Sequence, residues 1–235
     1  QDFFAPRTVF DGKHNLFRAF APTADPDYAR ALDGLGSAWL MERIAFKPYA
    51  CGTMIHPYID CMIRLAETGV EADEIVEVVC PTSDGLVHRL WEPLDAKHRP
   101  PSGYAAKFSM PFGMAVGFLT GAAGLDQFTD AMAADPEILH LAGKIRYVLD
   151  PEDPYPDNYT GTIQVRLRDG REVEMHQPHM RGGWREPLST AELVDKFRSN
   201  VVYGGWDTAR GEALMDVCLG VEAVPSMRVL EAFRG

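Results

Sequence analysis

Several features that would define a functional class are missing from this sequence of 235 residues. Its four cysteines show no CxxC spacing, which argues against a zinc site and a disulfide framework, so we expect reduced thiols in a cytoplasmic protein. No apolar run has the length of a membrane span, and the first residues do not have the pattern of a signal peptide. GxSxG, P-loop, HExxH and GxGxxG motifs are also absent, which argues against serine hydrolase, P-loop nucleotide and Rossmann-type functions.

Positive charge is scarce as well. The 23 Lys and Arg residues against 34 Asp and Glu give a formal net charge of −11, which argues against a nucleic-acid partner because phosphate neutralisation needs clustered cations. An acidic protein that binds an anion must gather its few cations locally. This requirement directs attention to Lys47, Lys107 and the segment 181–185.

Periodicity and turn signals predict an α+β fold with a small, largely antiparallel sheet and helices on one of its faces, over about residues 40–180. Residues 81–103 are rich in turn formers and are predicted as a long loop. The strands are expected at 39–46, 74–80, 144–149, and in a hairpin of 160–168 and 171–176 around Asp169-Gly170. The helices are expected at 26–34, 56–68, 103–120 (kinked at Pro111 or starting near 110), 125–133, 136–142, 187–200 with a Ser189–Glu192 capping box, 206–219 and 225–233.

The segment FKPYACGTMIHPYID (46–60) is the first candidate for chemistry. It places Lys47 and His56 at a predicted strand–turn–helix corner, where free backbone N–H groups suit a carboxylate ligand. Lys47 could bind that carboxylate or stabilise enolate charge; the alternative is a solvated lysine at a strand end. His56 could act as a general acid or base or hydrogen-bond the substrate; the alternative is a helix-terminal histidine bonded to backbone.

Three further residues are candidates for substrate binding. Lys107 lies in an apolar segment, where it reaches either a ligand or, by snorkelling, the solvent. Ser109 could donate to a carboxylate or cap a helix. Arg185 follows Gly182-Gly183-Trp184 and could clamp a carboxylate, unless this loop is only a linker. His176 and His179 have no third ligand, so we expect a solvated strand end there and no metal site.

Taken in order, these stretches resemble the MmgE/PrpD family of carboxylate dehydratases, decarboxylases and epimerases. The resemblance covers nearly the whole chain. The segments that carry it are IAFKPYACGTMIHPYID (44–60), EIVEVVC (74–80), AAKFSMPFGMAVGFLTG (105–121), DPEILHLAGKIRYVLD (135–150), RLRDGRE (166–172) and GGWREPLSTAELVDKF (182–197).

The resemblance implies a two-part fold, in which a chorismate-mutase-like α+β lid covers a large helical domain. Residues 1–39 would be an entry segment with a short helix, 40–187 the lid, and 188–235 C-terminal helices that pack on the helical domain and complete it. The chain's beginning reads as a start in the middle of a fold, so we expect a second protein chain carrying the N-terminal helical half, and a higher oligomer.

The family site lies between the two parts and uses no metal and no organic cofactor. By position, Lys47 and His56 match the lid motif, whereas Phe112 stands where the family often has tyrosine, a departure that bears on proton transfer. The resemblance implies a lyase of dehydratase type acting on a small di- or tricarboxylic acid. The alternatives are an epimerase (isomerase) of the same family, or a non-catalytic structural or regulatory subunit. Catalytic use predicts that Lys47 and His56 face an open cleft.

Overall fold

The structure, a computed structural model, describes residues 13, 15, 18–19 and 27–234. The chain divides into two compact units, residues 1–42 and 43–235, which are described separately. Most of the predicted entry segment lies outside the described residues. In the first unit, helix α2 (Tyr28–Leu32) begins where the Asp27 carboxylate accepts the N–H of Arg30 at 2.9 Å, in agreement with the predicted short helix.

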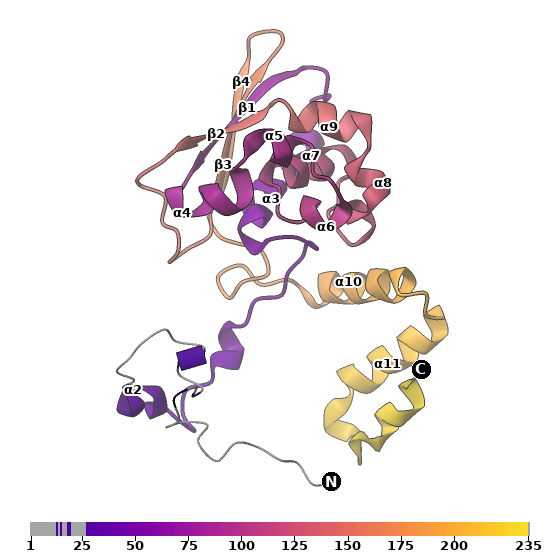
Figure 1. The fold of residues 1–235 in the computed structure, drawn as a ribbon. Coiled ribbons are helices and arrows are strands. Elements are labelled where there is room, and N and C mark those ends of the chain that lie inside the picture. Colours follow the sequence, from indigo (N-terminus) through magenta and orange to yellow (C-terminus); the bar gives the residue numbers. More distant parts are fainter. Residues whose placement is uncertain (1–12, 14, 16–17, 20–26, 235) are drawn as a thin grey trace. The chain divides into compact units, whose positions relative to one another are not determined.

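A four-stranded sheet forms one layer of the second unit (Figure 1). The strands are β1 (Ile75–Thr82), β2 (Ile145–Leu149), β3 (Gly161–Leu167) and β4 (Glu172–Gln177). Their order is β2-β1-β3-β4; β1 and β2 pair in parallel, and the other two pairings are antiparallel. The predicted α+β class, the hairpin and the largely antiparallel sheet are therefore confirmed.

Helices cover one face of this sheet. Along β3 the side chains alternate, with Ile163 and Val165 buried while Gln164 and Arg166 are exposed, as expected for a sheet with one packed face. Helix α3 (His56–Glu67) packs on β3 and β4, and α7 (Met110–Thr120) packs on α3. Helices α3 and α7 approach closely at Gly117, where an added Cβ would lie 2.8 Å from Ile59 Cγ2.

Two sequence-based predictions are wrong. Residues 39–46 form no strand; a 3-10 helix, η1 (Leu40–Arg43), occupies part of this segment, because local hydrogen bonds such as Glu42 N–H to the Trp39 carbonyl (3.4 Å) pair its backbone, and Trp39 is 66% exposed. Residues 81–103 are not a structureless loop. Leu86, Leu90 and Trp91 are buried in the core, and their burial outweighs the turn-forming composition. The elements there are α4 (Asp84–Leu86), the π-type η3 (Val87–Trp91), α5 (Leu94–His98) and α6 (Gly103–Ala106).

The predicted helix over 103–120 is divided. Helix α6 ends at Ala106, and α7 begins at Met110 with Ser109 as its N-cap and Pro111 in its first turn, as the alternative start near 110 anticipated. Short helices follow, as predicted: η4 (Asp126–Phe128), α8 (Asp130–Ala133) and α9 (Pro136–Ala142). Within the described part of the chain, no helix is both long enough and apolar enough to cross a membrane.

The C-terminal region is helical. Helix α10 (Thr190–Tyr203) has the predicted capping box of Ser189 and Glu192, and α11 (Thr208–Leu219) packs on it. The last elements, η5 (Val221–Ala223) and η6 (Met227–Phe233), are 3-10 helices, whereas an α-type amphipathic helix was expected at 225–233. None of the residues of α10 is fully buried, and Val202, Tyr203 and Leu219 are exposed. A role of these helices in a helical domain stays a prediction.

Candidate active site

The loop between Phe46 and α3 forms the corner predicted from the sequence, although no strand enters it. The Phe46 N–H donates to the carbonyl of Gly182 at 2.9 Å, which fixes this loop beside the segment that contains Arg181. A 3-10 turn, η2 (Thr53–Ile55), leads into α3, which begins at His56 with Pro57 in its first turn. Lys47 is exposed, and its Nζ donates to the carbonyl of Cys51 at 3.3 Å.

His56 lies behind this surface. Its side chain is 0% exposed, and neither ring nitrogen has a hydrogen-bond partner. Burial lowers the pKa of His56 to about 3; the Cys51 backbone, close to the ring but outside hydrogen-bond geometry, opposes this shift, and the charges of Lys47, Arg181 and Lys196 add to it. The imidazole is therefore neutral near pH 7. Tyr49 meets it edge to face, with ring centroids 5.3 Å apart.

The fold brings Lys107 to the same corner. The Gly52 N–H donates to the Lys107 carbonyl at 2.8 Å. Burial raises the pKa of the Cys51 thiol to about 12, while the charges of Lys47 and Lys107 both act to lower it. Two lysines that are 60 positions apart in the sequence thus lie near one buried thiol, and positive charge is concentrated there in an acidic protein.

Ser109 is placed differently. Its side chain is fully buried, and its hydroxyl donates to the Lys97 carbonyl at 2.5 Å and accepts the Phe112 N–H at 3.1 Å. Both interactions are with backbone, so the structure favours the capping alternative over carboxylate binding. Phe112, also fully buried, packs near Phe128 with ring centroids 6.0 Å apart.

Arg185 is not brought to this corner. It is exposed, stacks over the Trp184 ring at 5.0 Å from its centroid, and lines a hollow of about 240 Å³ with Arg43 and His179. Neither Lys47 nor His56 lines that hollow. His179 contacts Asn158 (3.2 Å) and His176 contacts Thr162 (2.8 Å), so the two histidines have separate partners. Among the described residues, no three His, Cys, Asp or Glu side chains gather as a metal-binding set.

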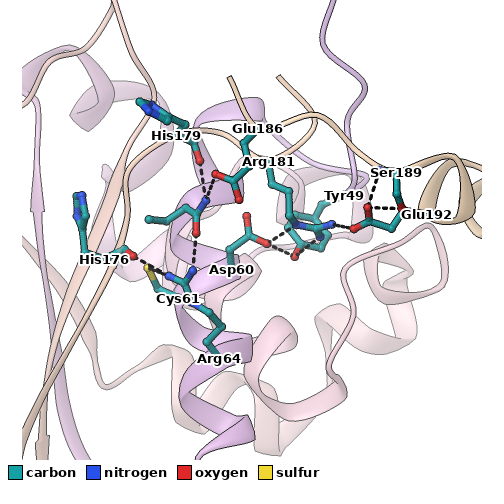
Figure 2. A network of polar contacts seen from close by, with 11 residues as sticks. Tyr49, Asp60, Cys61, Arg64, His176, His179, Arg181, Glu186, Ser189 and Glu192 are labelled. Carbon is teal, nitrogen blue, oxygen red and sulfur yellow. Dashed lines mark hydrogen bonds and ion pairs between the residues drawn. The ribbon is translucent and has the colours of Figure 1, made fainter. Parts of the chain in front are cut away.

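A polar network joins the corner to α10 (Figure 2). The Tyr49 hydroxyl donates to Asp60 at 2.5 Å, and Arg181 donates to Tyr49 Oη at 3.0 Å and to Asp60 at 3.1 Å. A third Arg181 nitrogen donates to Glu192 of α10 at 2.7 Å. Arg181 therefore links α3, the corner loop and the first turn of α10.

Burial controls the titration of this network. Burial raises the pKa of Tyr49, and the Asp60 carboxylate raises it further. Burial also raises the pKa of Asp60, although hydrogen bonds from Tyr49 and Arg181 oppose the shift. For Arg181, burial acts to lower the pKa, but the contacts with Tyr49 and Asp60 outweigh it and the net shift is upward. Arg181 thus remains charged, and its charge compensates that of Asp60.

Comparison with known proteins gives this geometry a context. Residues 49–220, most of the chain, match the family model described as the MmgE/PrpD C-terminal domain. The chain belongs to the MmgE/PrpD family. The resemblance found in the sequence is therefore confirmed, and the positions of His56, Lys107, Ser109 and Arg185 fall inside the matched range, while Lys47 lies two residues before it.

Curated MmgE/PrpD relatives are similar at low identity. Mouse cis-aconitate decarboxylase is 25% identical over 78% of this chain and 38% of its own length. The Aspergillus terreus cis-aconitate decarboxylase is 24% identical over 84% of this chain and 41% of its own length. The human cis-aconitate decarboxylase is 27% identical over 56% of this chain and 27% of its own length. The chain thus spans about two fifths or less of the relatives that it matches.

Sequence reasoning had missed most of the network in this MmgE/PrpD chain. One signal was available: Asp60 follows His56 by four residues in α3, so the two share a helix face. The segment 181–185 had been selected for its charge, and Glu192 for its capping box. Nothing local, however, indicates that Arg181 contacts Asp60, which lies 121 positions away.

Proposed function

We propose that this MmgE/PrpD chain supplies the lid side of the active site of a cofactor-independent lyase, of dehydratase type, acting on a small di- or tricarboxylic acid. The observation that carries the proposal is that Lys47 and Lys107 meet at the Cys51-Gly52 turn next to the buried His56: Lys47 Nζ donates to the Cys51 carbonyl at 3.3 Å, and the Lys107 carbonyl accepts the Gly52 N–H at 2.8 Å. In an acidic protein, such a concentration of cations suits an anionic ligand.

The arrangement supports a sequence of proton-transfer steps. Lys47, at the surface, binds a substrate carboxylate and stabilises the negative charge that spreads onto it when a base removes the α proton. The base takes that proton, and the intermediate then expels the β-hydroxyl group as water once the oxygen has been protonated. His56 is neutral and fully buried, and a pKa of about 3 makes it a weak base, so we propose that the base that removes the α proton comes from the second part of the site.

We also propose a second part of the site. This chain spans 38% of the length of the mouse relative and 41% of the fungal one. Exposed apolar side chains on α10 and α11 fit a further helical partner. We therefore propose that a helical domain, carried by a partner chain, completes the site in a higher oligomer.

A non-catalytic subunit is the second candidate, and one observation favours it. Lys47 is exposed, as a substrate-binding group must be, but His56 is fully buried in this structure. A structural subunit would leave both residues without a substrate.

Turnover by the native assembly tests the proposal. The assembly, purified from its source, is incubated in D2O with a panel of hydroxy di- and tricarboxylic acids and followed by NMR. Loss of the hydroxyl group identifies a dehydratase, release of CO2 a decarboxylase, and deuterium at an inverted α carbon an epimerase. Lys47→Met is expected to lower turnover by about 100-fold, while Lys144→Met, a charge-matched control in another region, retains it. Absence of turnover with every acid would favour the non-catalytic subunit.

A further inference from the structure

Helix α10 borders a cleft to which neither the sequence analysis nor the proposed function assigns a role. The cleft has a volume of about 430 Å³ and lies between α10 and the segment 121–127, with Tyr49 and Arg181 in its lining. This volume is within the range of sites for small ligands. From α10 it receives Glu192, Asp195 and Lys196.

Most charges in this cleft are compensated. Arg181 is paired with Asp60 and Glu192, and Glu192 also accepts hydrogen bonds from Ser189. Asp195, on the exposed side, lies 3.8 Å from Arg198. Asp126 is exposed to solvent.

Lys196 is the exception. Its side chain is half-buried, and among residues 27–234 no hydrogen bond or ion pair engages its ammonium group. Burial lowers the pKa of Lys196, and no neighbouring carboxylate offsets this shift. A partly desolvated ammonium without a partner beside a cleft gains a counter-ion when an anion binds there.

The cleft also adjoins the candidate active site. Tyr49 lines it and contacts the His56 ring on its other side. The charge of Lys196 acts on His56 together with those of Lys47 and Arg181. Lys47 of the corner loop, Arg181 and Lys196 of α10 therefore all act on the pKa of the same histidine.

We infer that Lys196 is a substrate-binding residue, whose ammonium group holds one carboxylate of a small polycarboxylic acid in the cleft between α10 and residues 121–127. The inference rests on the proposed function and adds to it a residue from the C-terminal helices. These helices would then form part of the substrate site itself as well as a surface for the helical domain.

Binding of citrate to the full chain, measured by calorimetry, tests this assignment. Lys196→Met is expected to raise the dissociation constant about tenfold or more, because a charge-assisted contact is lost. Lys196→Arg keeps the charge and is expected to retain most of the affinity. Lys144→Met removes a lysine that does not line the cleft and is expected to bind as wild type does.

The outcomes separate this inference from the proposed function. If Lys196→Met binds citrate normally while Lys47→Met binds it weakly, the role of Lys196 is overturned and the proposed function stands. If the wild-type chain binds no citrate, the role of Lys196 is overturned, and the proposed function is decided separately by turnover of the native assembly. If Lys196→Met weakens citrate binding but the native assembly turns over no carboxylic acid, the binding role stands and the proposed function fails.

A second measurement uses no variant. Trace acetylation of the wild-type chain, read at each lysine by mass spectrometry, is expected to show that citrate protects Lys196 and leaves Lys144 unchanged. Equal labelling of Lys196 with and without citrate would overturn the inference.

Discussion

Burial sets the protonation of the side chains around the corner loop. His56 is held neutral, the Cys51 thiol is held protonated, and Arg181 stays charged beside Asp60. Lys47 differs, because it remains at the surface. At the residue scale, the corner therefore combines one accessible cation, Lys47, with a buried neutral imidazole, His56.

The burial of His56 has a consequence for stability against pH. Its pKa is about 3 in the folded chain and near 6.5 in the unfolded chain, so the unfolded state binds the proton more readily. The stability linked to His56 is fully present above about pH 6.5 and is lost as the pH falls toward 3, by about 1.4 kcal/mol per pH unit.

Replacing His56 should remove this dependence. Between pH 7 and pH 5, urea unfolding of His56→Gln is expected to lose about 2 kcal/mol less free energy of unfolding than the wild type does. Comparing the two curves cancels the titration of the carboxylates that both proteins share. Parallel curves would show that His56 titrates normally and would contradict its burial.

Tyr49 connects Asp60 with Arg181 through a single hydroxyl group. Tyr49→Phe removes that group and leaves a buried carboxylate with one partner fewer, so we expect the free energy of unfolding to fall by about 1–3 kcal/mol. Tyr104→Phe is the control, because the Tyr104 side chain is 73% exposed. Equal effects of the two substitutions in urea unfolding would show that the network contributes no stability.

At the scale of elements, α3 and β3 hold the first turn that carries His56. Gly161 of β3 permits their close approach, since an added Cβ would lie 2.7 Å from the backbone carbon of Pro57. Gly161→Ala is expected to lower the free energy of unfolding by about 2 kcal/mol, because backbone cannot yield as a flexible side chain can. At Gly143, an added Cβ meets nothing nearer than 3.4 Å. Thermal melts that show the same loss for Gly143→Ala would contradict this account.

Local sequence signals predicted those elements whose formation depends on neighbouring residues in the chain. The capping box of Ser189 and Glu192, the Asp169-Gly170 hairpin and the Pro57 helix start all appear in the structure. The predictions for residues 39–46 and 81–103 were wrong for a shared reason. Composition indicates the local propensity of a segment, whereas tertiary packing decides which secondary structure it adopts. Lys47 and Lys107 could be selected by charge, but the contacts of Asp60 and the position of Lys196 beside the cleft depend on tertiary structure.

At the scale of the whole molecule, the exposed apolar side chains of the C-terminal helices predict self-association. Val202, Tyr203, Leu219 and Met227 are all exposed. We expect the chain by itself to show a mass that rises with concentration in light scattering. In the presence of the proposed helical partner, the amides of α10 and α11 are expected to exchange with deuterium more slowly. A stable monomer at every concentration would argue against the proposed docking of a helical domain on these helices.

The central claim is that this MmgE/PrpD domain forms a carboxylate lyase together with a helical domain. The most direct test is the native mass of the assembly from its own source, with every polypeptide identified and turnover of carboxylic acids measured in the same fraction. The account predicts a stoichiometric helix-rich partner and turnover that follows it. A single copy of this chain, monomeric, stable and without turnover, would contradict the claim.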